Sequence, residues 1–187
     1  MTNFETLVYY LQMGFTHVLP LGFDHVLFVV CLFLFTPSIR NVVFQCSIFT
    51  LAHSLTLVLV AYGLLLPHSK IIEPLIAVSI LIAAVENIIH SKMNPWRLVI
   101  IFAFGLVHGL GFAAGLLNAD LPKSQMLSSV LSFNLGVEIA QIAIICILFI
   151  LVYKIKKKHW YTERIVYPVS SLIACTALYW TIDRILN

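Results

Sequence analysis

The sequence predicts an all-α membrane protein, a bundle of about six transmembrane helices with both termini on the outer side. Hydrophobic residues make up 61% of the 187 residues, and charged residues make up only 10%. The mean hydropathy of +1.01 lies above the range of soluble globular domains. We therefore expect residues 1–187 to form a single integral membrane domain in contact with lipid.

Six apolar segments are the expected spans, because each approaches or exceeds the roughly 20 residues that a helix needs to cross a bilayer. They cover residues 18–36, 42–65, 72–91, 97–117, 128–153 and 164–186. Proline residues mark the first four breaks, and the lysine-rich residues 154–159 form the fifth. The proline breaks contain Pro37, Pro67, Pro95 and Pro122.

The chain before the first span is more polar. Residues 1–16 are expected to form a short N-terminal segment, with an interfacial helix over residues 4–15. Pro20 and Gly22 are expected to bend the chain as it enters the first span, because proline removes a helical hydrogen bond.

Lysine and arginine are distributed unevenly between alternate loops. One side carries eight: Arg40, Lys92, Arg97, Lys154, Lys156, Lys157, Lys158 and Arg164. The other side carries three: Lys70, Lys123 and Arg184. The positive-inside rule places the richer loops in the cytoplasm, so we expect a multi-pass protein of a bacterial inner (cytoplasmic) membrane. These cations form no helical face, and nucleic acid is not an expected partner.

Seven ionisable residues lie inside segments that otherwise resemble membrane spans. They are His17, Asp24, His25, His53, Glu86, His108 and Glu138. Placing a charge at the bilayer centre costs roughly 2.5 to 3.5 kcal/mol, so the presence of seven such residues calls for a shared explanation. Counted along the helices, all but His17 fall roughly 9 to 21 Å below the outer surface of a core about 30 Å thick. A shared metal site is the simplest explanation.

The first segment, HVLPLGFDHVLF, carries His17, Asp24 and His25. Asp24 and His25 are both candidate ligands, and Asp24 could instead orient a histidine by accepting its second N–H. The alternative is an aspartate that caps a helix start beside an interfacial histidine.

Two further segments each carry one central histidine. In FTLAHSLTL, His53 is surrounded by hydroxyl side chains, including Ser54, and the alternative is a bundle histidine with protein partners. In FGLVHGLGFAAG, His108 stands among glycines that allow a neighbouring helix to approach, and the alternative is a packing helix that contains a histidine by chance.

The fifth span carries a polar stripe, because Asn134, Glu138 and Gln141 in FNLGVEIAQ follow the spacing i, i+4 and i+7. Glu86 lies in the third span. A buried carboxylate needs a metal, a histidinium or a proton, so each of these must be considered for Glu86 and Glu138. Ser54, Asn134, Gln141 and Glu86 are the expected supporting polar residues.

At these residues the sequence resembles the HupE/UreJ family of hydrogenase and urease accessory membrane proteins, in its shorter second branch. The matching blocks are HVLPLGFDHVLF, FTLAHSLTL, EPLIAVSI, AAVEN, FGLVHGLGFA and FNLGVEIAQ, between residues 17 and 141. The resemblance implies a permease or accessory protein for a divalent transition metal, usually nickel, with cobalt as a second candidate. It also implies metalloenzyme maturation partners. The ligands that it implies are His17, Asp24, His25, His53, His108 and Glu138, with Glu86 as a further candidate.

Three functions remain open at this point. Mixed histidine and carboxylate ligands suit Ni, Co or Zn, so a metal permease or delivery protein is the leading interpretation. The second is an intramembrane zinc hydrolase acting on a lipid or a membrane-anchored peptide, with Glu138 or Glu86 as the base, although no HExxH motif is present. The third is a structural metal-binding subunit, and a homo-oligomer is compatible with all three.

Overall fold

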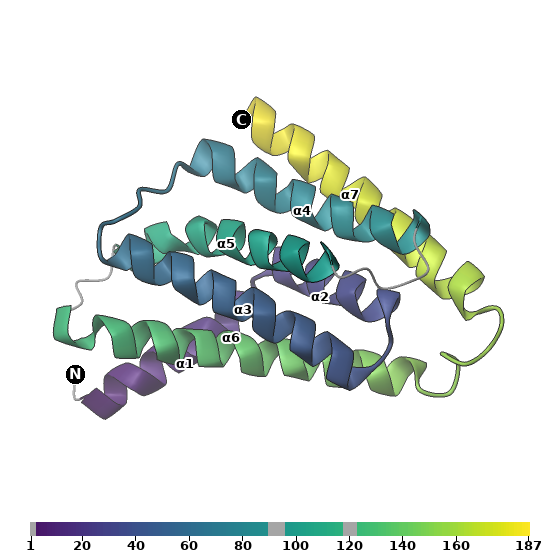
Figure 1. Ribbon diagram of the computed structural model, residues 1–187, viewed down its shortest axis with the longest axis horizontal. Helices are drawn as coiled ribbons and strands as arrows, with labels where there is room; N and C mark the ends of the chain where they lie inside the picture. The colour runs from purple at the N-terminus through teal and green to yellow at the C-terminus, as the bar shows by residue number, and fades with distance from the viewer. Residues whose placement is uncertain (1–2, 90–95, 118–122) are drawn as a thin grey trace.

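The computed structural model describes residues 3–89, 96–117 and 123–187, and these residues are helical apart from short connections, with no strand among them. Figure 1 shows the central helices lying roughly along one direction, with the first and the last helix inclined to them. They are α1 (Asn3–Val18), α2 (Phe23–Phe35), α3 (Ile39–Ala61), α4 (Ser69–Ile89), α5 (Trp96–Leu117), α6 (Lys123–Val152), a π-helical turn η1 (Thr162–Val166) and α7 (Tyr167–Leu186). The all-helical class expected from the composition is confirmed.

The packing places α3 at the centre of one layer, where it contacts α5 and α6. The N-terminal helix α1 packs along α6, and the C-terminal helix α7 packs along α4 (Figure 1). The short helix α2 lies among these elements and contacts α3, α4 and α6. Because α2 carries two of the seven ionisable residues, its central position buries His25 in the bundle, while Asp24 stays partly exposed.

Four helices of the described chain are long and apolar enough to cross a membrane. They are Ile39–Ala61, Ser69–Ile89, Gln125–Val152 and the continuous stretch Thr162–Leu186. The pair α1 and α2 makes a fifth if it is counted as one broken span, and residues Trp96–Phe112 of α5 form a further apolar stretch. The expected six spans are therefore supported in part, and the sides on which the termini lie stay a prediction.

The bend expected at Pro20 and Gly22 is confirmed, because α1 and α2 meet at 68° across a break of four residues. The helix of the first expected span thus begins at Phe23 and not at residue 18. Its 13 residues reach only about 20 Å, which is less than the core of a bilayer.

The helix α1 is longer than the expected residues 4–15 and packs closely against α6. Its buried residues are Thr6, Tyr10, Gly14 and Val18, one per turn along a single face. A Cβ atom at Gly14 would overlap the backbone of Phe133, and one at Gly136 would overlap that of Leu11. Glycine on both helices therefore permits backbone contact. Whether α1 lies at the membrane interface stays a prediction.

Candidate metal centre

Three histidines from three helices meet at one point of the bundle. His17 lies in the last turn of α1, His25 in the first turn of α2 and His53 in the middle of α3. One nitrogen of each ring lies within 4.8 Å of the corresponding nitrogens of the other two. Among the described residues these three form a group with metal-ligand spacing.

His108 of α5 stands next to this group. Its ring centroid lies 5.1 Å from that of His25, compared with 4.7 Å between His17 and His25. The four residues His17, His25, His53 and His108 are called the histidine cluster from here on. All four are candidate ligands from the sequence, so the structure brings together the four histidines that were named as candidates.

The break between α1 and α2 explains how the first two histidines come together. A Cβ atom at Gly22 would overlap the carbonyl oxygen of His17, so the chain turns back closely on the end of α1. His25 follows three residues later in α2, and its ring meets that of His17 edge to face. An uninterrupted helix through this segment would separate the two rings by two turns.

Close packing of α5 on α3 brings the other two histidines together. A Cβ atom at Gly105 would overlap the carbonyl oxygen of Phe49 and the side chain of Ala52. One at Gly109 would overlap the carbonyl oxygen of His53 and the hydroxyl of Thr56. The glycines flanking His108 thus allow the helix contact that the sequence pattern predicted.

Each of two cluster histidines has one hydrogen-bonding partner outside the cluster. His53 Nδ1 lies 3.1 Å from Asn134 Oδ1, and His108 Nε2 lies 3.0 Å from Ser79 Oγ. Asn134 was an expected supporting residue. The role of Ser79 in α4 was not anticipated, because a serine in an apolar helix usually bonds only to its own backbone.

Four ring nitrogens of the cluster are buried without a protein hydrogen-bond partner. They are His17 Nε2, His25 Nε2, His53 Nε2 and His108 Nδ1. A buried polar atom that lacks a partner is costly, and native structures satisfy nearly all such atoms. Neutral imidazole is the commonest ligand of transition metals. Three of these rings have metal-ligand spacing and the fourth stands next to them, which fits a metal ion held by nitrogen ligands.

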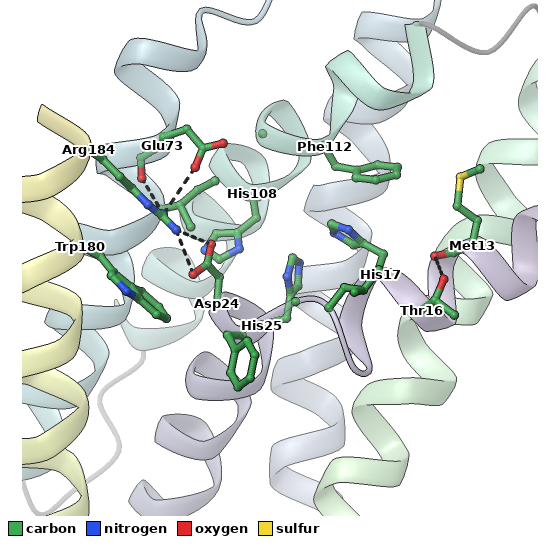
Figure 2. Close-up of a pocket in the computed structure, with 15 residues that line it drawn as sticks. Met13, Thr16, His17, Asp24, His25, Glu73, His108, Phe112, Trp180 and Arg184 are labelled. Carbon is green, nitrogen blue, oxygen red and sulfur yellow. Dashed lines mark hydrogen bonds and ion pairs between the residues drawn. The ribbon is translucent and has the colours of Figure 1, made fainter. Parts of the chain in front are cut away.

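A pocket of about 440 Å³ gives access to the cluster. His17, His25 and His108 line it, and Figure 2 shows Phe112 beside the ring of His17. His53 is fully buried and lies outside this lining. Leu21 is strongly exposed and also lines the pocket, which marks its open side.

The same pocket contains a charged group centred on Arg184 of α7. Arg184 Nη2 lies 3.1 Å and 3.2 Å from the two carboxylate oxygens of Asp24. Its Nη1 donates to the backbone oxygen of Glu73 at 3.0 Å and lies 3.6 Å from the Glu73 carboxylate (Figure 2). Asp24 thus lies at the pocket with an arginine partner and outside the group of three histidines that have metal-ligand spacing.

The other two candidate carboxylates lie away from the pocket lining and have partners of their own. Glu86 forms an ion pair with Arg97, which is 2% exposed and whose Nε donates to Gln45 at 3.0 Å. Glu138 is half-buried and accepts a hydrogen bond of 2.6 Å from Ser47. Glu86 and Glu138, which were expected at the same depth in the membrane as the histidines, therefore lie apart from the histidine cluster.

The remaining supporting candidates lie on α3 and α6. Gln141 accepts a hydrogen bond of 3.1 Å from Thr50, and the Ser54 hydroxyl donates to the backbone of Thr50 at 2.7 Å. Of the polar stripe on α6, only Asn134 reaches the histidine cluster. One residue of the stripe thus serves the site, while Gln141 and Glu138 join α6 to α3.

Phenylalanine side chains close the side of the cluster opposite the pocket. The rings of Phe28 and Phe49 lie 5.0 Å apart, and Phe104 lies 6.1 Å from Phe28. These three residues are called the aromatic layer. Phe49 also contacts His108, at 5.0 Å between ring centroids. The cluster is therefore accessible from the pocket and covered by apolar side chains on its other side.

Comparison with known proteins gives one family. A family model described as HupE / UreJ protein matches residues 2–184, nearly the whole chain. No curated protein and no solved structure matches the sequence.

Proposed function

Because the chain belongs to the HupE/UreJ protein family, we propose that it binds a divalent transition metal at the histidine cluster and carries or delivers that metal. Its role would be that of a nickel- or cobalt-type permease, or of an accessory protein that supplies a metalloenzyme maturation partner. The observation that supports this most strongly is the grouping of His17, His25 and His53 at metal-ligand spacing, with a buried Nε2 atom on each ring that has no protein partner. We place the protein in a bacterial inner membrane.

The proposed ligands are the four histidines of the cluster. Nitrogen ligands suit the borderline metals Ni, Co and Zn, and they discriminate against Mg and Ca, which prefer oxygen. Asp24 and Glu138 were also candidates, but Arg184 and Ser47 hold their carboxylates. A hydrogen-bonded carboxylate can still bind a metal, but neither of these two belongs to the group with metal-ligand spacing.

Access from one side supports a carrier. The pocket reaches three of the cluster histidines, whereas the aromatic layer covers the opposite side. A carrier that exposes its site to alternate sides of the membrane needs such a closed side in each of its states. By the distribution of basic loops, the pocket would open to the outer face.

The positions of the carboxylates do not favour a hydrolase. A zinc-bound water needs a general base within hydrogen-bonding reach, directly or through one water. Glu86 is paired with Arg97 and Glu138 with Ser47, and neither lines the pocket. Among the described residues, the carboxylates that line the pocket are those of Asp24 and Glu73, and both are paired with Arg184.

The test is metal stoichiometry in protein purified with an affinity tag that contains no histidine. We expect wild-type protein to bind one nickel or cobalt ion per chain, and His53→Ala and His108→Ala to lose it. The matched control is the double variant His68→Ala/His159→Ala, since both side chains are exposed and lie outside the cluster. Full stoichiometry in both cluster variants would defeat the proposal.

Transport is tested in vesicles that contain the protein and an entrapped metal indicator. We expect metal to enter vesicles with wild-type protein and not those with His53→Ala. Binding without uptake would assign the protein to metal delivery. Tightly held zinc together with hydrolysis of a membrane lipid would support the hydrolase instead.

A further inference from the structure

The hydrogen bonds of Asn134 determine which nitrogen of His53 carries the proton. Asn134 Nδ2 donates to the backbone oxygen of Val130 at 2.8 Å. A carbonyl oxygen can only accept, so the amide NH₂ group must face Val130 and the amide oxygen must face His53. The reversed amide would set two acceptor oxygens against each other. His53 Nδ1 therefore carries the proton that bonds to Asn134 Oδ1, 3.1 Å away.

The same reasoning applies to His108 and gives the opposite tautomer. The single hydroxyl proton of Ser79 is donated to the backbone oxygen of Ile76, at 2.7 Å. Were that proton turned towards His108, two oxygens 2.7 Å apart would face each other without a proton between them. Ser79 Oγ therefore accepts from His108, and His108 Nε2, at 3.0 Å, carries the proton.

These two assignments determine what the unpartnered nitrogen of each ring can offer. In a neutral imidazole the nitrogen without a proton carries a lone pair, which falls on His53 Nε2 and on His108 Nδ1. These are the two atoms of these rings that are buried without a protein partner. The four residues involved are at most 5% exposed, so bulk water does not compete for these bonds.

We infer that Asn134 and Ser79 are positioning residues that fix the tautomers of His53 and His108, so that these rings offer Nε2 and Nδ1, respectively, to a metal. This inference rests on the proposed function, because the lone pairs matter only if a cation binds them. It also extends the site to α4 and α6, which contribute no ligand themselves. Partners of this kind orient the ring and keep the binding nitrogen free of a proton.

The first experiment reads the tautomers in metal-free protein. Nuclear magnetic resonance of protein with ¹⁵N-labelled histidine distinguishes a protonated ring nitrogen from a bare one. We expect a proton on Nδ1 of His53 and on Nε2 of His108. The opposite tautomer of either ring in the wild-type protein would overturn the inference, and this result does not depend on any variant.

The second experiment measures the affinity for cobalt(II) in matched variants. Asn134→Leu and Ser79→Ala should each weaken binding by roughly 10- to 100-fold, the range found when such partners are lost. Asn134→Asp and Ser79→Thr keep the accepting oxygen and should recover most of the affinity. In the same spectra, Asn134→Leu and Ser79→Ala should release the fixed tautomer of His53 and His108, respectively.

The controls are Asn87→Leu and Ser170→Ala. Asn87 Nδ2 donates to Ser170 Oγ at 3.2 Å, which is a buried hydrogen bond between α4 and α7 without a histidine. Asn87 is 5% exposed, as is Asn134, and Ser170 is fully buried. If Asn134→Leu and Ser79→Ala lose no more affinity than these controls, only the inference fails. If wild-type protein binds no cobalt, the proposed function fails, and the positioning role fails with it.

Discussion

A methyl group at Gly109 tests whether the contact between α5 and α3 sets the geometry of the histidine cluster. The Cβ atom of Gly109→Ala would lie 2.5 Å from the carbonyl oxygen of His53, where ordinary contact begins at 3.4 Å. This oxygen belongs to the backbone and cannot move aside as the end of a side chain can. The helix α5 must therefore withdraw from α3 by about 1 Å.

The expected cost follows from two opposing effects. Overpacking of this kind destabilises by about 1 to 3 kcal/mol. Alanine returns up to about 1 kcal/mol through its higher helix propensity. We expect the free energy of unfolding to fall by about 1 to 2 kcal/mol, measured by denaturant titration in detergent and followed by circular dichroism.

Gly111→Ala is the matched control, because it lies in the same helix and gains the same helix propensity. Its Cβ atom would meet the terminal methyl of Ile76 at 2.6 Å, the end of a flexible side chain that can rotate away. We expect a stability change within about 0.5 kcal/mol. Equal stability of Gly109→Ala and Gly111→Ala would refute the reasoning, since the two positions would then have the same freedom to adjust.

Two other interactions and the metal itself give further predictions. Glu86→Ala leaves the buried charge of Arg97 without its counter-charge, which should cost about 3 to 5 kcal/mol in the same titration, while the folded protein keeps its metal stoichiometry. Asp24→Asn should cost no more than about 1 kcal/mol, because its ion pair with Arg184 is partly exposed, and a larger loss or a loss of bound metal would contradict this placement. Nickel at one hundred times its dissociation constant should stabilise wild-type protein by about 2.7 kcal/mol, and the same shift in His17→Ala would argue against His17 as a ligand.

The helices could be predicted from the sequence because the length of each apolar segment indicates where a membrane-spanning helix lies. The expected span 42–65 is helical over Ile39–Ala61, and the expected span 72–91 corresponds to Ser69–Ile89. The position of the bend could also be predicted, since Pro20 and Gly22 stand between two apolar runs. Its angle could not, because that angle depends on how α1 packs against α6 and α2 against its neighbours.

The arrangement within the candidate site was only partly predictable. Depth along a helix places Glu86 and Glu138 near the histidines, but it does not give the direction in which a side chain points around the helix axis. Glu138 points to Ser47, and Glu86 points to Arg97. Arg97 was counted as a loop cation at the membrane boundary, yet it is almost fully buried. An acid in a span with an arginine at the start of the next span was the available indication of that ion pair.

The break between α1 and α2 divides the histidine cluster into two pairs, one held rigidly and one whose spacing can change. His53 and His108 are held by helices whose backbones touch through Gly105 and Gly109, so their separation has little freedom to vary. His17 and His25 stand on either side of a four-residue connection between helices that meet at 68°. Rotation about a few torsion angles in that connection would change the distance between these two rings while the contact between α3 and α5 stayed intact. The distance between the rings of His17 and His25 is thus the one that can change most easily, and the connection at residues 19–22 controls it.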